Sequence, residues 1–150
     1  MKTKTIVLTF LSVVLAAGVS GQEQNKWSIG VYTDLVKSGN TGFLEHFQAA
    51  TEVNYQAAKC ISVSGGFEYW GPYTGLGMIA GLRYYPHKNI FFRARRIFFI
   101  DSEAIGGGWK NAIGKGWNVE AMADYYVQKT MGDYASKRTV AVRAGITRSF

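Results

Sequence analysis

The sequence has few of the residues and segments that are typical of several common classes of protein. It contains one cysteine, Cys60, which excludes a framework of intramolecular disulfides. It contains only two prolines, against 18 glycines and many aromatic residues, a balance that suits an all-β chain better than a helical one. Beyond residue 21 no apolar run approaches the roughly 18 residues of a membrane-spanning helix. If such a chain enters a membrane, it must satisfy its backbone hydrogen bonds as a closed barrel.

The first 21 residues have the pattern of a secretory signal peptide. Lys2 and Lys4 give a positive start, and residues 6–17 form an apolar core that is short for a retained membrane anchor. Small residues follow at 18–21, so we expect cleavage before Gln22 and export of residues 22–150 as one domain. No cysteine lies in the cleavage region, which argues against a lipoprotein.

The charge balance is basic, with a formal net charge of +7 that falls by two when Lys2 and Lys4 leave with the signal. For an exported chain, outer-membrane lipid and lipopolysaccharide are better matched anionic partners than nucleic acid, and we expect no nucleic-acid binding. We also expect no cofactor and no metal, because no His, Cys and carboxylate cluster has the spacing of metal ligands.

The rest of the chain consists of short segments in which apolar and polar residues alternate, the two-residue period of a β-strand with one apolar face. Turn residues separate these segments. The last segment shows the pattern well, since its apolar face carries Val140, Val142, Ala144, Ile146 and Phe150. Eight segments are recognised in this way: 27–37, 44–55, 60–70, 76–85, 90–100, 104–113, 117–128 and 137–150.

Eight strands of about 10 residues suffice for the smallest transmembrane barrel. We therefore predict an all-β fold, an eight-stranded antiparallel up-and-down transmembrane β-barrel. Tight turns at 57–59, 86–89 and 114–116 should lie on one rim, as periplasmic turns do. For the second and third strands, setting Tyr55 opposite Ile61 brings Val53 against Val63 and keeps apolar and polar faces matched. Gly106–Gly108 is expected to mark a bend or a close approach.

The pair Arg95 and Arg96 interrupts the alternation of the fifth segment. Strict alternation would put Arg96 on the apolar face near mid-strand, at a cost of roughly 2–4 kcal/mol at a bilayer midplane. We predict instead a β-bulge that turns both arginines inward and returns Ile97 and Phe99 to the outside. A protein partner that covers Arg96 is the alternative.

These features together resemble the small eight-stranded outer-membrane β-barrel family of Gram-negative bacteria, over the whole chain after the signal. The motif is the C-terminal strand, with terminal Phe150 and alternating Ile146, Ala144 and Val142. The resemblance implies that these residues form the signal read by the barrel-assembly machinery. Arg148 departs from the pattern, since an apolar or aromatic residue is usual there, but at a rim it could reach lipid headgroups. Members differ widely in function, so the resemblance supplies none.

Aromatic residues are predicted to form two girdles, as they do at membrane interfaces. The alternative is ordinary aromatic packing in a soluble barrel. One girdle would contain Trp27, Tyr55, Tyr84, Trp117 and Phe150, and the other Phe47, Tyr69 and Tyr125.

The inward faces carry charges of both signs in nearly matched numbers. Side chains just fill an eight-stranded barrel, and buried charges must be paired, so we predict a lumenal network of salt bridges. A proton or ion path through the same carboxylates is the alternative. The predicted network comprises Asp34, Glu52, Glu68, Arg83, Arg93, Arg95, Glu120, Asp124 and Arg143, with Arg96 added if the bulge forms.

We expect a non-enzymatic integral outer-membrane β-barrel, a structural or accessory subunit of an envelope complex, with other envelope proteins as partners. One alternative is a secreted soluble barrel that binds a small apolar ligand, which would place Glu120, Asp124 and Arg143 in solvent. Another is a lipid-modifying outer-membrane enzyme. His46, Ser62 and Ser64 share a face, but they lack nucleophile–base spacing.

Overall fold

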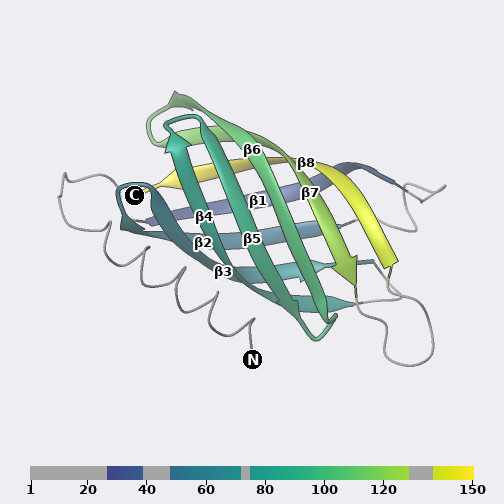
Figure 1. Cartoon of the computed structure of the whole chain (residues 1–150). Coiled ribbons are helices and arrows are strands. Elements are labelled where there is room, and N and C mark those ends of the chain that lie inside the picture. The colour runs from purple at the N-terminus through teal and green to yellow at the C-terminus, as the bar shows by residue number, and fades with distance from the viewer. Residues whose placement is uncertain (1–26, 39–47, 72–74, 129–136) are drawn as a thin grey trace.

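The computed structural model describes residues 27–38, 48–71, 75–128 and 137–150, so the predicted signal peptide lies outside the described residues. Eight antiparallel strands form a closed barrel in chain order, with β8 paired back to β1 (Figure 1). The predicted all-β barrel fold is confirmed. Among the described residues, no helix is long and apolar enough to cross a membrane. The strands are β1 (Trp27–Lys37), β2 (Ala49–Ala58), β3 (Ile61–Tyr69), β4 (Leu76–His87), β5 (Ile90–Phe98), β6 (Ser102–Gly114), β7 (Trp117–Gln128) and β8 (Lys137–Ser149).

The two ends of the barrel differ, and we name them by what they carry. The turn rim holds the tight turns at 59–60, 88–89 and 115–116, together with Trp27 and Phe150, and lies at the left in Figure 1. The loop rim is the opposite end, where the β5–β6 turn at 99–101 lies and where Trp70 follows β3. The three tight turns therefore share one rim, as the sequence predicted.

The register of the β2–β3 hairpin differs from the prediction by two residues. Tyr55 lies opposite Val63, not Ile61, and Val53 lies opposite Gly65. The cause is a longer β2, which continues to Ala58 through a register shift and then turns at residues 59–60. Because the error is an even number of residues, every side chain still lies on its predicted face.

The predicted bulge at Arg95 and Arg96 is wrong. β5 pairs with both neighbours without a shift in this region, and Ile97 is fully buried inside the barrel while Phe98 points outward. Arg96 therefore lies on the outer face, but β5 ends at Phe98, so Arg96 is two residues from the strand end and not at mid-strand.

Two acids next to the β5–β6 turn explain how Arg96 is accommodated. Its guanidinium forms ion pairs with Asp101 and Glu103, and the Arg96 side chain is 35% exposed. A long side chain near a strand end can carry its charge toward the rim while its stem stays on the apolar wall. Neither a bulge nor a covering protein is needed.

Large aromatic residues occupy both ends of the outer face. At the turn rim Trp27, Tyr84, Trp117 and Phe150 are exposed, and half-buried Tyr55 packs against Trp27 with ring centroids 4.7 Å apart. At the loop rim the exposed aromatic residues are Tyr69, Phe98, Phe99 and Tyr125. Phe47 lies outside the described residues. The two predicted girdles are present, apart from that residue, and Trp109 adds to the first.

Glycines make room where β-strands and interior side chains approach closely. Gly145 lies opposite Tyr32 in the β1–β8 register, and a Cβ there would overlap the Tyr32 ring and approach the Val31 carbonyl oxygen to 2.8 Å. On β6, a Cβ at Gly106 or Gly108 would overlap the backbone of β7. The expectation of close approach at Gly106–Gly108 is therefore confirmed.

Replacing Gly145 with alanine should destabilise the barrel, because the Tyr32 ring must move to admit a methyl group. We expect the free energy of unfolding in detergent micelles to fall by about 1–3 kcal/mol, as measured by urea titration. Gly65→Ala is the matched control, since its nearest neighbour would be the Ile79 carbonyl oxygen at 3.7 Å, an ordinary contact. Equal losses from the two substitutions would contradict this account of Gly145.

Candidate functional site

The barrel interior brings together all nine residues of the predicted network. Each of them is at most 6% exposed. They come from every strand except β6, because each strand of a barrel directs alternate side chains inward. Strand β6 contributes glycines instead, and a side chain at Gly106 would occupy the space of the Asp124 carboxylate.

Glu52 is the centre of this network. Its carboxylate accepts hydrogen bonds from Arg83 at 2.8 Å, from Arg95 at 2.9 Å and from Arg93 at 3.3 Å. The three arginines come from β4 and β5, while Glu52 comes from β2, so these contacts cross the lumen. One buried carboxylate thus joins opposite walls of the barrel.

Two acids of β7 hold the same arginines from the other side. Asp124 accepts from Arg93 Nε at 2.9 Å and from Arg95 at 3.1 Å. Glu120 accepts from Arg83 at 2.8 Å and from the Thr147 hydroxyl at 3.2 Å. Each of the three arginines is therefore shared between β2 and β7.

Arg143 connects the last strand to the first and third. Its guanidinium pairs with Asp34 on β1 and with Glu68 on β3, and Arg143 itself is fully buried. Glu68 also accepts from Arg95 at 3.2 Å. Asp34 and Arg143 lie opposite each other in the β1–β8 register, so this pair stands at the junction that closes the barrel.

Two tyrosines complete the network, and the sequence did not assign them this role. Arg83 donates to the Tyr32 hydroxyl at 2.9 Å, and Arg95 donates to the Tyr126 hydroxyl at 2.6 Å. The Tyr126 hydroxyl also lies 3.3 Å from Glu68. By alternation Tyr32 shares the face of Asp34, and Tyr126 shares the face of Asp124. Nothing in the pattern distinguishes a hydrogen-bonded tyrosine from one that only fills space.

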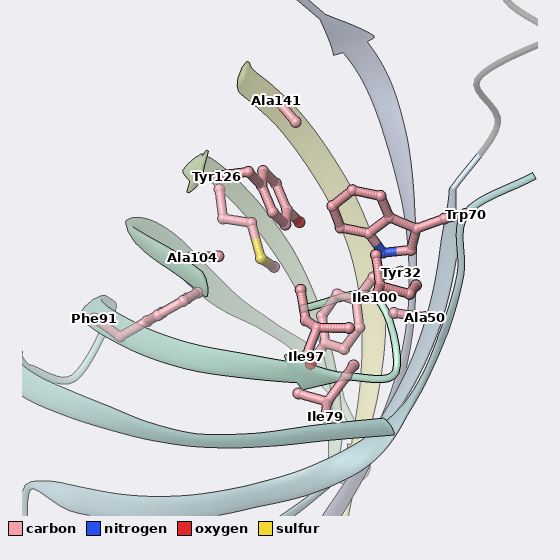
Figure 2. Packing of buried hydrophobic residues seen from close by; sticks show 11 residues of the cluster. Tyr32, Ala50, Trp70, Ile79, Phe91, Ile97, Ile100, Ala104, Tyr126 and Ala141 are labelled. Atoms are coloured by element: carbon pink, nitrogen blue, oxygen red, sulfur yellow. The ribbon is translucent and has the colours of Figure 1, made fainter. Parts of the chain in front are cut away.

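An apolar cluster fills the lumen between this network and the loop rim. Figure 2 shows Trp70 and Tyr126 side by side, with ring centroids 5.4 Å apart in an edge-on arrangement. Lys37 Nζ lies 4.6 Å from the centre of the Trp70 ring. We use the name apolar plug for the part of the buried apolar cluster on the loop side, namely Ala50, Trp70, Ile79, Ile97, Ile100, Ala104, Tyr126 and Ala141.

The other sequence predictions have different outcomes. Among the described residues, no three His, Cys, Asp or Glu side chains are grouped to hold a metal ion. His46 lies outside the described residues, while Ser62 and Ser64 are buried in the lumen. On β8, Val142 and Ile146 are exposed on the outer wall and Ala144 is partly exposed there, and Phe150, directly after β8, is also exposed. The Arg148 guanidinium lies 5.3 Å from the centre of the Trp117 ring.

Glu52→Gln should be strongly destabilising, because it leaves three buried arginines short of a charge. We expect a loss of about 3–5 kcal/mol in the free energy of unfolding, measured by urea titration in micelles. Asp101→Asn is the control, since it weakens the partly exposed pair with Arg96 and should cost less than about 1 kcal/mol. Similar losses in both variants would show that the buried network contributes no more to stability than the partly exposed pair of Asp101 and Arg96.

Comparisons with known proteins show which solved structures share this fold. No protein-family model and no curated protein sequence matches the chain. The N-terminal β-barrel domain of Pseudomonas aeruginosa OprF is similar with a TM-score of 0.55 and 14% identity, over 86% of this chain and 100% of that one. Neisserial surface protein A is similar with a TM-score of 0.52 and 11% identity, over 83% and 95%. A de novo designed transmembrane β-barrel gives 0.50 and 10%, over 87% and 100%. The chain has the fold of the small eight-stranded outer-membrane β-barrels.

Proposed function

We propose that this chain is a non-enzymatic integral outer-membrane β-barrel, a structural or accessory subunit of an envelope complex. The observation that carries the proposal is the inverted distribution of polarity across the wall. Arg143 is fully buried, whereas Ile146, three residues along the same strand, is 52% exposed. A wall with charges inside and apolar side chains outside suits lipid as its surroundings.

The outer face also varies along the barrel axis in the way a bilayer requires. Outward aliphatic residues such as Val53, Leu82 and Val142 are 36–43% exposed, and they lie between the two aromatic girdles. Tryptophan and tyrosine favour the interface between hydrocarbon and water, so two girdles mark the two surfaces of a membrane. The girdles support a barrel that crosses the full hydrocarbon layer.

The filled lumen favours a structural or accessory role over conduction. Each of the five carboxylates is paired with at least one arginine, and the apolar plug closes the loop side. An ion that entered would have to displace buried salt bridges and then cross an apolar region, and both steps are costly. The interior therefore favours a stabilising role for the network over an ion path.

The outer wall supplies the surfaces for the proposed partners. Outer-membrane lipid would cover the apolar band, and Arg148 at the turn rim could reach the phosphates of lipid, while lipopolysaccharide is the other anionic neighbour. We further propose that the barrel-assembly machinery reads Val142, Ala144 and Ile146 on β8 together with Phe150, which follows it. Other envelope proteins would bind the wall or the rims.

The soluble-barrel alternative loses its main support. It required Glu120, Asp124 and Arg143 in solvent, but these residues are at most 3% exposed. A soluble barrel with this wall would also present an apolar surface of many large side chains to water, which favours aggregation.

A charge placed on the outer wall distinguishes lipid from water. Val142→Arg, near the middle of β8, should lower the free energy of unfolding in phospholipid bilayers by about 2–4 kcal/mol, measured by urea titration in vesicles. Ile113→Arg is the control, because Ile113 is exposed next to the last residue of β6 at the turn rim, where the cost should be about 1 kcal/mol or less. A tolerated Val142→Arg would contradict a lipid-facing wall.

Fractionation of a Gram-negative host tests the location directly. The exported chain should sediment with outer membranes, resist extraction by high salt, and dissolve only in detergent. Its gel mobility should change when it is boiled, since a closed barrel that resists detergent migrates differently from the unfolded chain. Recovery as a soluble periplasmic protein would refute the proposed location.

A further inference from the structure

The turn end of the lumen is hollow. A cavity of about 810 Å³ lies there, within the range of small-ligand sites. The salt-bridge network bounds the cavity on the side facing the loop rim. Two lining residues show this, since Ser62 lies opposite Arg83 in the β3–β4 register and Lys110 lies opposite Glu120 in the β6–β7 register. The cavity is therefore a blind vestibule that opens at the turn rim.

The wall of this vestibule is positively charged. Lys59, Lys88 and Lys110 line it, and no aspartate or glutamate among the described residues does. Within the described residues none of these lysines has a carboxylate partner. Glu120, the acid opposite Lys110, is already held by Arg83 and Thr147. Three ammonium groups around one opening attract an anion.

Uncharged polar groups without partners lie deeper in the wall. Asn54 is 4% exposed, and both its amide nitrogen and its amide oxygen lack a hydrogen-bond partner among the described residues. The Ser62 hydroxyl, on a residue that is 3% exposed, also lacks one. Buried polar atoms are nearly always satisfied, so water or a ligand that can both donate and accept would suit these atoms.

We propose that the vestibule binds a soluble anionic sugar, meaning a small carbohydrate with a phosphate or carboxylate group. The oxyanion would lie among Lys59, Lys88 and Lys110, and sugar hydroxyls would meet Asn54 and Ser62. Tyr85, half-buried in the same wall, offers a flat ring for an apolar face of the sugar. An inorganic anion would leave the amide to water, and an apolar ligand would leave all these groups to water.

This inference goes beyond the proposed function and does not depend on it, because the vestibule can be assayed in micelles. The purified exported chain in a non-ionic detergent is titrated calorimetrically with glucose 6-phosphate, glucuronate, glucose and inorganic phosphate. At least one anionic sugar should bind saturably, at least tenfold more tightly than glucose and inorganic phosphate. The two anionic arms distinguish a phosphate from a carboxylate ligand.

Cys60 supplies an independent readout of where the ligand binds. It lines the vestibule, is partly buried, and is the chain's single cysteine. A saturating concentration of the bound sugar should slow its alkylation by iodoacetamide at least fivefold, while glucose should leave the rate unchanged. Unchanged alkylation during saturable binding would place the ligand elsewhere and overturn the inference.

Substitutions separate the anionic contact from the sugar contact. Lys110→Gln should weaken the anionic sugar about fivefold, because it removes one charge-assisted contact. Asn54→Ala should weaken the sugar similarly but leave inorganic phosphate unaffected. Lys115→Gln is the matched control, since Lys115 lies on the same rim but not in the lining, and its effect should stay below twofold.

Boiling-dependent gel mobility checks that each variant is a folded barrel. The inference is overturned if neither anionic sugar binds saturably, if inorganic phosphate binds as tightly as the sugars, or if Lys115→Gln and Lys110→Gln weaken binding equally. The last result would mean that diffuse positive charge, and not the vestibule, attracts the ligand.

Discussion

The burial of four arginines beside five carboxylates is the constraint on which the rest of this barrel depends. None of these charges is tolerable alone in the lumen, so the strands must hold their partners in register. Glu52 joins β2 to β4 and β5, and Arg143 joins β8 to β1 and β3. Gly106 on β6 follows from the same constraint, because a side chain there would displace Asp124, an acid that the arginines need.

The outer wall must present an apolar surface and still accommodate basic residues, and it does so with a few kinds of side chain. Its middle is aliphatic, its ends are aromatic, and two of its arginines lie beside groups that stabilise their charge. Arg96 is accompanied by Asp101 and Glu103, and Arg148 by the Trp117 ring. Both arrangements satisfy a cation locally, so the chain can carry basic residues on an apolar surface without breaking its strands.

Sequence alternation predicted the faces because it has a period of two, and the faces then located all nine network residues. It could not fix the β2–β3 register, since a shift by two leaves the faces unchanged. The bulge prediction, which departed from strict alternation, misplaced Arg96, because the end of β5 is decided by pairing with its neighbours and not by local residues. The vestibule was also beyond it, because Lys59 and Lys110 meet only after the barrel closes.

The interior changes character along its axis, from the apolar plug through the ionic layer to the polar vestibule. A lumen with this order is open at one end and closed at the other, so it is not a channel. Solute that enters the open end must leave by the same end, so occupancy reports the composition of one compartment only. A barrel of the smallest size can in this way be insulated from one side of a membrane while remaining in equilibrium with the other.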